Sequence, residues 1–571
     1  MELRLTSAAL VVVLATYAFL GMMGLTDREN PDPRDAGYNL LARGLLSGHL
    51  HIDKEAPPGL RALADPYDPA ANKPFRVGVA SRLHDISFYR GRLYLYFGVA
   101  PALLVFIPWH VLTGGWLPHW CAVALLCAAG LLVNLSLVRS VKGRVFPGSP
   151  PWMLAVLTLI LGLGSYAPLL LSRADMWEVP IAFSYLAVSV ALRCLWAAFC
   201  RPEGAAAWIA GASAALGAAF AARPNMLPNA AILALPFAFG ATRRSPRAWA
   251  AAILPIGLCG AAVALYNALR FGNPFEFGQH YQLAGQYVAR LKLFSAGYLP
   301  TNLRLYLLQP VQWSSVYPFA NEPPDGMLPP DHGTVEHMSG VLLNAPILWA
   351  ALAVPLFIRS RRPGPALALL SAGAAWVFAS SLVVIALFFG GCSRYQSEFT
   401  PALALLAALG VMALESALSG AARGLARCAW VPLLAVSCAF PVLYGIDRCV
   451  VDHDFEGFAC IARGDVRGAQ REFDIAALLS PASPFARLES GAMLSASGRS
   501  AEALAVFESL VRDHPDYAMG QSDLGHELAV RGRLDEAVEH YEIAHRLSPD
   551  DAMIKAALDK ALAERARRDR R

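Results

Sequence analysis

The chain has 571 residues, of which 56% are hydrophobic and only 16% charged, and its mean hydropathy is +0.43. These values exceed those of soluble globular proteins and indicate a membrane protein. The net charge of +5 is small for this length, and no basic stripe with interleaved aromatic residues occurs, which argues against a nucleic-acid-binding protein.

The ten cysteines indicate neither a disulfide framework nor a metal site, because most lie inside apolar runs and no Cys-x-x-Cys occurs. His49-x-His51 and the stretch from Asp331 to His337 also lack a strong metal-ligand spacing, so we place no metal there. Arginine far outnumbers lysine, a bias typical of GC-rich bacterial genomes. We therefore expect a multi-pass protein of a bacterial inner membrane.

Eleven apolar stretches approach the length of about 20 residues that a membrane-spanning helix needs. They are 5–25, 118–138, 152–172, 178–198, 204–222, 225–241, 248–268, 341–358, 365–389, 398–417 and 428–446. The first follows Arg4 without a clear small-x-small cleavage site, so we expect a retained helix and not a signal peptide. The predicted fold is all-α, a polytopic transmembrane helical bundle with about 11 spans plus interfacial helices.

The run 95–113 is ambiguous, because it is short and contains two prolines. If it lies in the membrane interface, the N-terminus is cytoplasmic and every major basic cluster faces the cytoplasm, as the positive-inside rule requires. These clusters lie at 139–144, 243–247, 359–362 and 423–427. We therefore predict an interfacial helix here, which places the loops 26–95 and 269–340, and all residues after 447, on the outer face.

Two acidic turns lie on this outer face. Asp35 follows the first membrane helix and precedes an amphipathic stretch with Tyr38 and Ala42, and Asp175 lies in a short turn two crossings later. An aspartate often caps a helix N-terminus, which is the alternative role at both positions. Paired carboxylates at a membrane surface also suit a reaction that needs a base.

This layout resembles the GT-C glycosyltransferases, polytopic enzymes that take a sugar from a polyprenyl-phosphate carrier. Asp35-x-x-Tyr38 followed by Ala42 is similar to the Asp-Glu-x-x-Tyr stretch of the protein-mannosyltransferase and aminoarabinose-transferase branch, although Ala36 replaces the Glu. The Lys-Pro-Pro of that family is also absent, and Gly91 to Pro101 is the nearest analogue. The resemblance covers about residues 1–450 and implies an inverting transfer. It leaves open a divalent cation held by loop carboxylates and implies no other cofactor.

Within this resemblance we expect Asp35 to accept the proton of the acceptor hydroxyl. Arginines of the outer face would stabilise the leaving lipid phosphate by charge-assisted, bidentate hydrogen bonds. The expected substrate-binding residues are Arg394 first, then Arg173, Arg223 and Arg270, together with Tyr38, Asp175 and Tyr395. The alternative for such arginines is snorkelling beside lipid headgroups. Aromatic residues in 281–317 fit an interfacial belt or a surface that stacks on sugars.

The end of the chain repeats with a period of 34 residues. The repeating positions are Pro481, Pro515 and Pro549; Gly457, Gly491 and Gly525; Gly464, Gly498 and Gly532; Ala469, Ala503 and Ala537; and Phe473, Phe507 and Tyr541. This register resembles the tetratricopeptide repeat, a helix–turn–helix unit that stacks into an α-solenoid.

We divide the chain into a transmembrane domain at 1–449 and a repeat domain at 450–571. Three repeats, at 450–483, 484–517 and 518–551, precede a capping helix. The small residues in register pack helices and bind nothing, so we expect a protein partner to bind in the concave groove of the repeats.

Three functions are open at this point. The first is a glycosyltransferase that moves a sugar from a polyprenyl-phosphate carrier to an envelope lipid, glycan or protein acceptor. The second is a non-catalytic scaffold or assembly factor, but ten or more crossings exceed what an anchor needs. The third is a transporter, but the ionisable residues lie at outer helix ends and not in mid-membrane. We expect the first.

Overall fold

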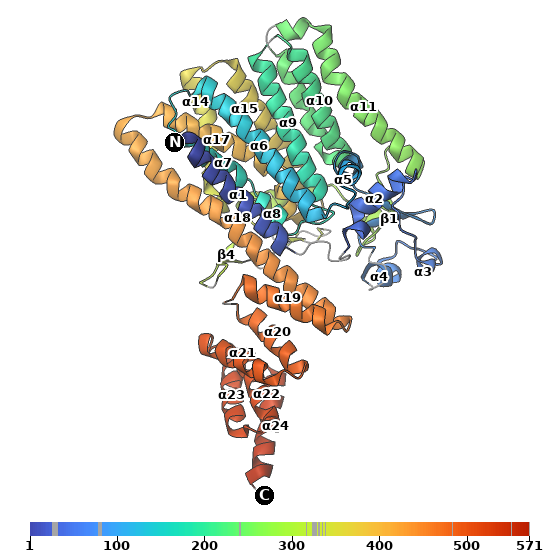
Figure 1. The fold of residues 1–571 in the computed structure, drawn as a ribbon, viewed down its shortest axis with the longest axis vertical. Coiled ribbons are helices and arrows are strands. Elements are labelled where there is room, and N and C mark those ends of the chain that lie inside the picture. Colours follow the sequence, from blue (N-terminus) through green and yellow to red (C-terminus); the bar gives the residue numbers. More distant parts are fainter. Residues whose placement is uncertain are drawn as a thin grey trace. The chain divides into compact units, whose positions relative to one another are not determined.

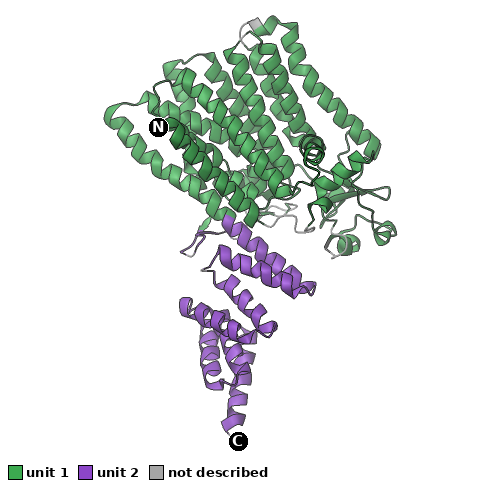
Figure 2. Cartoon of the chain, in the orientation of Figure 1, with its two compact units in different colours: residues 1–312, 322–445 green, residues 313–321, 446–571 purple. Residues whose placement is uncertain are grey.

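The structure is a computed structural model. It describes residues 1–24, 32–77, 83–201, 203–238, 241–315, 317–321, 328, 332–333, 335–336, 338–481, 483–549 and 551–569. Asp331 and His337, considered above as metal ligands, lie outside the described residues. The chain forms two compact units, residues 1–312 with 322–445 and residues 313–321 with 446–571 (Figure 2).

The first unit is a bundle of long apolar helices (Figure 1). Among the described residues, eight helices are long and apolar enough to span a membrane. They are α1 (Glu2–Met23), α6 (His119–Val145), α9 (Val179–Cys200), α10 (Ala205–Ala222), α11 (Pro246–Phe271), α15 (Pro365–Ala386), α17 (Thr400–Ala417) and α18 (Gly420–Ala462). The protein is therefore a multi-pass membrane protein, as predicted. Helix α18 is continuous over 43 residues and continues past 445 into the second unit.

The other three expected crossings are built from shorter elements. Residues 152–172 form α7 (Met153–Gly162) and α8 (Ala167–Leu171), residues 225–241 form most of the 3₁₀ helix η3 (Pro224–Phe237), and residues 341–358 form α13 (Val341–Asn344), η8 (Pro346–Leu352) and most of α14 (Ala353–Arg361). Proline explains much of this difference, because it removes a backbone donor and clashes with the preceding turn. Pro228 and Pro236 lie inside η3, and Pro346 begins η8. The described residues therefore show eight such helices, and the expected count of about 11 spans is not shown.

The long helices run between two ends of the bundle. At one end, which we call the loop end, His119 Nδ1 lies 3.3 Å from Asp175 Oδ1, and the backbone N–H of Tyr38 donates to His119 Nε2 at 3.3 Å. At the other end, Lys142 Nζ lies 3.0 Å from Glu2 Oε2. Helices α1 and α6 are therefore antiparallel, and the turns that carry Asp35 and Asp175 lie at the same end.

The run 95–113 stays at the loop end. It contains the π-helical turn η2 (Ala102–Phe106) and α5 (Ile107–Thr113), which Figure 1 shows nearly end-on beside the long helices. Before it, Gly98 N donates to Ala222 O at 3.2 Å, and after it, Leu117 O accepts from Asn39 Nδ2 at 2.8 Å. Both of these contacts lie at the loop end, so the run does not pass between the two ends of the bundle.

Short strands join the two loops of this end. Strands β1 (Ile86–Tyr89), β2 (Arg92–Leu95) and β3 (Gln282–Leu283) form an antiparallel sheet in the order β2-β1-β3, with Ile86 opposite both Leu95 and Leu283. The two-residue turn between β1 and β2 is Arg90-Gly91, and both residues have positive φ, as a tight hairpin turn of this hand requires.

A second pairing lies between β6 (Val335–Glu336) and β7 (Gly391–Cys392), which are parallel, with Glu336 opposite Cys392. Strands β4 (Gln312–Trp313) and β5 (Ala320–Asn321) also pair. The remaining short helices are η1 (Pro33–Asp35), α2 (Gly37–Leu46), α3 (Pro58–Arg61), α4 (Pro69–Val77), η4 (Ala241–Arg244), η5 (Gln279–Tyr281), η6 (Val288–Arg290), η7 (Ala296–Tyr298), α12 (Leu299–Leu308) and α16 (Ser393–Gln396).

The second unit consists of stacked helix pairs (Figure 2). After the end of α18 come α19 (Val466–Leu479), α20 (Pro484–Ala496), α21 (Ser500–Asp513), α22 (Ala518–Val530), α23 (Leu534–Leu547) and α24 (Ala552–Asp569). A Cβ atom added at Gly457 or Gly491 would lie 2.5 Å from the ring of Phe473 or Phe507. The repeated glycines therefore allow the two helices of a pair to touch.

The second set of repeated glycines forms the turns within the pairs. Gly464, Gly498 and Gly532 have φ values of 77°, 78° and 78°. This left-handed region favours glycine, which explains the spacing of these positions in the sequence.

Candidate functional site

A cavity of about 300 Å³ lies within the first unit at the loop end. Three of the expected site residues, Arg223, Arg394 and Tyr395, line it. Its other walls are mainly aromatic and aliphatic: Tyr96, Phe97, Gly98, Trp177, Ala222, Pro224, Asn225, Phe277, Gln279, Phe294, Val384, Ile385 and Phe388. Two cationic side chains among apolar ones suit an amphipathic anion.

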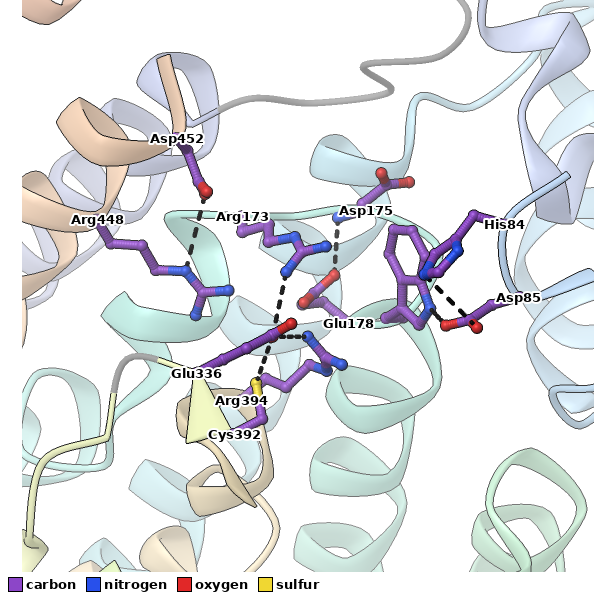
Figure 3. A network of polar contacts seen from close by, with 11 residues as sticks. His84, Asp85, Arg173, Asp175, Glu178, Glu336, Cys392, Arg394, Arg448 and Asp452 are labelled. Carbon is purple, nitrogen blue, oxygen red and sulfur yellow. Dashed lines mark hydrogen bonds and ion pairs between the residues drawn. The ribbon is translucent and has the colours of Figure 1, made fainter. Parts of the chain in front are cut away.

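Arg394 lies on α16, directly after β7. Its Nη1 donates to Glu336 Oε2 at 3.0 Å, and Arg173 Nη1 approaches the same oxygen at 3.5 Å (Figure 3). Cys392 Sγ donates to this oxygen at 3.2 Å. The pairing of β6 with β7 therefore places one loop carboxylate between two arginines from distant parts of the chain.

The charge of Arg394 is secured by its surroundings. Burial would lower the pKa of its guanidinium, but Cys392, the Glu336 carboxylate and Tyr395 raise that pKa, and the net shift is upward. Arg394 is therefore a permanent cation at the wall of the cavity.

Arg223 follows the end of α10 and forms a buried ion pair. Its Nη2 lies 2.5 Å from Oε1 of Glu398, and Asn225 Nδ2 donates to Oε2 of the same carboxylate at 2.6 Å. Burial raises the pKa of Glu398, and Arg223 and Asn225 counteract this only in part. The guanidinium groups of Arg223 and Arg394 both lie over the ring of Tyr395, at 5.6 and 5.3 Å from its centroid, which favours cation–π attraction.

Tyr38 and Asp175 form a buried cluster with His119 behind the cavity. Tyr38 is fully buried, and its hydroxyl donates at 3.3 Å to the carbonyl of Gly98, a residue of the cavity wall. Burial raises the pKa of Asp175, but hydrogen bonding and charge from His119, the Met176 amide and Arg173 lower it more, so the net pKa is below its usual range. Asp175 does not cap α9, whose N-cap is Glu178.

Asp35 ends η1, and its side chain is 56% exposed. Its Oδ1 accepts from Arg43 Nη1 at 3.1 Å, and it is not among the residues that line the cavity. The N-cap of α2 is Ala36, so Asp35 does not cap this helix. The expected base is thus not part of the cavity wall.

Arg270 is buried and engaged in structural contacts. It donates to Leu95 O at 3.0 Å and to Asn267 Oδ1 at 2.7 Å, and its guanidinium lies 3.9 Å from the centroid of the Tyr266 ring. These contacts hold the end of α11 against β2. Arg270 and Arg173 do not line the cavity, although Arg173 approaches Glu336, which pairs with the cavity residue Arg394.

Three carboxylates near the cavity were not singled out from the sequence: Asp85, Glu336 and Glu398. Asp85 precedes β1 with a φ of 58°, and its Oδ2 accepts from the indole N–H of Trp177 at 2.9 Å. Glu398 lies four residues after the expected site residue Arg394, which was a usable signal, whereas Glu336 lies within the weak metal pattern from Asp331 to His337. Their roles depend on loop pairings that periodicity does not reveal.

Within the described ranges, no group of three or more His, Cys, Asp or Glu side chains is arranged to hold a metal ion.

No known protein-family model matches this chain, and a search of curated proteins found no match. Among solved structures the chain is similar to ArnT from Cupriavidus metallidurans bound to undecaprenyl phosphate, with 15% identity over 90% of this chain and 80% of that one and a TM-score of 0.39.

It is also similar to the archaeal oligosaccharyltransferase AglB from Archaeoglobus fulgidus in complex with an inhibitory peptide and a dolichol-phosphate, with 13% identity over 76% of this chain and 56% of that one and a TM-score of 0.34. A third likeness, to the APC/C hetero-tetramer Cut9–Hcn1, has 12% identity, covers 81% of this chain and 93% of that one, and has a TM-score of 0.21. At these values the likenesses do not establish a family.

Proposed function

We propose that the first unit is a membrane glycosyltransferase that moves a sugar from a polyprenyl-phosphate carrier to an envelope lipid, glycan or protein acceptor. The observation that carries this proposal is the cavity at the loop end, where Arg223 and Arg394 lie among apolar side chains. A lipid-linked phosphate combines an apolar chain with an anion, which matches these two kinds of wall. A scaffold would not need a cationic cavity between its helices.

The arginines act on the leaving group. As the acceptor oxygen bonds to the anomeric carbon, the bond from this carbon to the phosphate oxygen breaks, and its electron pair stays with the phosphate. Arg394 and Arg223 stabilise that charge by charge-assisted hydrogen bonds. A phosphate is already a good leaving group, so no protein acid is required. Tyr395 holds both guanidinium groups in place.

A carboxylate takes the proton of the acceptor hydroxyl. Asp85 has the better position, because its partner Trp177 is a cavity wall residue. Asp35 is favoured by the family resemblance and lies in the same loop, but its carboxylate contacts Arg43. We propose Asp85 as the base and treat Asp35 as the rival candidate.

The other expected residues position this site. Tyr38 supports the backbone at Gly98, and Asp175 holds His119 beside Tyr38. Arg270 anchors β2, and Arg173 shares Glu336 with Arg394. A divalent cation beside the loop carboxylates is not part of this proposal.

We further propose eleven crossings, with the loop end on the outer face of a bacterial inner membrane. Helices α6 and α9 both begin at the loop end, as the His119–Asp175 contact supports, so the chain between them must return across the bundle. Helices α10, α11 and α15 all end there, as three hydrogen bonds to residues of that end support: Gly98 with Ala222, Arg270 with Leu95 and Asn302 with Ala386. The chain must therefore also return across the bundle between α10 and α11 and between α11 and α15. The three irregular segments are these return crossings.

The orientation follows from the basic clusters, which lie in the connections at the opposite end. The repeats would then follow on the outer face and bind a protein partner. An alkaline phosphatase fused after residue 447 should be active in intact cells. An inactive fusion that is produced at the same level would place the repeats in the cytoplasm.

Binding of the carrier lipid tests the proposed function. Purified full-length protein in detergent micelles should bind undecaprenyl phosphate, measured as a saturable thermal shift. The double variant Arg223→Ala/Arg394→Ala should weaken this binding by about tenfold or more. Arg304→Ala, which removes an exposed arginine of α12, should leave it unchanged. Absence of binding by the wild type, or an equal effect of both variants, would refute the proposal.

A further inference from the structure

Three carboxylates of the second unit lie in a row on the first helices of its three helix pairs. Asp454 is on the last part of α18, Glu489 on α20 and Asp523 on α22. Asp454 and Glu489 repel each other electrostatically, and so do Glu489 and Asp523. We call these three residues the acidic row.

The three helices that carry the row are neighbours. The rings of Phe458 on α18 and Phe485 on α20 lie 6.1 Å apart, and α20 packs against α22. Neighbouring helix axes are about 8–10 Å apart, so the row extends over roughly 16–20 Å. An extended peptide of about six residues covers this length.

The row has no partner in the described part of the chain: no ion pair or hydrogen bond joins Asp454, Glu489 or Asp523 to another described residue. Asp454 is only 9% exposed, and its Oδ1 is a buried acceptor without a hydrogen bond among those residues. Several other carboxylates of this unit do have such a partner. Those paired with an arginine include Glu456, Glu502, Asp513, Glu527, Asp535 and Glu536.

The surroundings of the acidic row disfavour the charged form of its carboxylates. Burial raises the pKa of Asp523 to about 6, and burial together with repulsion from Asp523 raises the pKa of Glu489. Partly buried like charges destabilise a fold unless something neutralises them. A ligand that supplies positive charge would remove this repulsion.

An aromatic side chain stands beside the row. The half-buried hydroxyl of Tyr517 interacts electrostatically with both Glu489 and Asp523. Arginine suits such carboxylates in particular, because the N–H groups of its guanidinium bind a carboxylate through two parallel hydrogen bonds.

We propose that the acidic row binds an extended, arginine- or lysine-rich segment of a partner protein, with a cationic side chain at about every third residue. The helix spacing sets this period. The proposal names the chemistry of the partner and does not depend on the sugar transfer assigned to the first unit.

The test uses the full-length protein in detergent micelles and a fluorescent peptide with arginine at every third position among glycine and serine. Anisotropy should show binding that weakens as salt is raised. The triple variant Asp454→Asn/Glu489→Gln/Asp523→Asn should lose about tenfold or more in affinity. The control Glu502→Gln/Asp513→Asn/Glu536→Gln removes the same charge from exposed, ion-paired positions and should change it by less than about twofold.

A charge swap guards against misfolding of the triple variant. The Glu489→Arg variant should bind the arginine peptide more weakly. It should bind more tightly a peptide whose central arginine is replaced by glutamate, and unfolding of the protein cannot produce such a gain. The proposal is overturned if the two triple variants lose affinity equally or if an all-glutamate peptide binds as well. It is also overturned if the arginine peptide binds only after the arginine-rich tail 565–571 is removed, since the row would then hold the protein's own tail.

Discussion

Arg394 and Glu336 form an ion pair at the edge of the cavity, with Nη1 of Arg394 3.0 Å from Oε2 of Glu336. The same oxygen receives the Cys392 thiol at 3.2 Å, and Arg173 lies 3.5 Å away. The Glu336 carboxylate, from the second loop, is thus paired with the arginine that would bind the phosphate in the proposed reaction (Figure 3). An arriving lipid phosphate would compete with Glu336 for Arg394.

Replacing this competitor should strengthen carrier binding. Glu336→Gln keeps the shape of the side chain but removes its charge, so affinity for undecaprenyl phosphate should rise by about threefold to tenfold. Thermal-shift titration measures this change. Glu276→Gln, which removes a loop carboxylate paired with His280, serves as the control and should have no effect. Weaker binding by the Glu336 variant would show that this carboxylate supports the site and does not compete.

Two carboxylates of the first loop, Asp85 and Asp35, are candidates for the base, and their variants should differ in transfer rate. Asp85→Asn should reduce the transfer rate by about 10²–10⁴-fold while carrier binding persists, because the amide cannot accept the proton. Asp35→Asn should cost far less, since this side chain is exposed and contacts Arg43. The rate is measured as the chase of label from lipid-linked sugar into glycan in membrane vesicles. The reverse order of the two variants would assign the base to Asp35.

The buried cluster behind the cavity should matter for stability. His119→Phe removes the side chain that contacts Asp175 at 3.3 Å and leaves a buried carboxylate with fewer partners. The expected loss is about 3 kcal/mol, visible as a lower Tm in micelles. His280→Phe removes an exposed histidine and should leave the Tm nearly unchanged. Equal Tm values for the two variants would contradict the role given to His119.

The repeats should respond to pH through Asp523, whose pKa rises from 3.8 to about 6 because of burial. Between about pH 4 and 6 the folded state holds a proton that the unfolded chain has released, so this residue makes the repeats less stable as pH rises. Asp523→Asn should therefore unfold at the same temperature as the wild type near pH 4 and at a higher temperature near pH 7.

Asp513 serves as the control for Asp523, because its pKa is shifted in the opposite direction: a hydrogen bond with Arg487 lowers it. Its contribution to stability is present above its unfolded pKa and is lost as pH falls, so Asp513→Asn should show no gain at neutral pH. Thermal unfolding of both variants across this range checks the sign. A constant difference between Asp523→Asn and the wild type at every pH would contradict the raised pKa of Asp523.

The fold was predictable where one short pattern determines one element. The length of the apolar runs predicted the long helices. The 34-residue period predicted the helix pairs, because the ring of Phe473 packs where Gly457 has no side chain and the turn at Gly464 needs a positive φ. Proline could have warned of the irregular crossings, since Pro228 and Pro236 lie inside η3. These segments are apolar as predicted, but each consists of shorter or 3₁₀-helical elements.

The site was predictable only in part, because it depends on contacts between distant segments. Arg223, Arg394 and Tyr395 were expected from their positions at outer helix ends, and they line one cavity. Asp85 could not be ranked above Asp35, because its position depends on the pairing of β1 with β3 across two loops. The acidic row does not follow the 34-residue period, because Asp454 is one residue out of the repeat register shared by Glu489 and Asp523.

The most direct test of the central claim compares the surface glycans and glycolipids of four strains by mass spectrometry: the wild type, a deletion of this gene, and deletions complemented with Arg394→Ala or with Arg304→Ala. The account predicts that one sugar is missing from the same acceptor in the deletion and in the Arg394→Ala strain, with unused lipid-linked donor accumulating in both, and that Arg304→Ala restores it. Identical glycans in all four strains, or full restoration by Arg394→Ala, would contradict it.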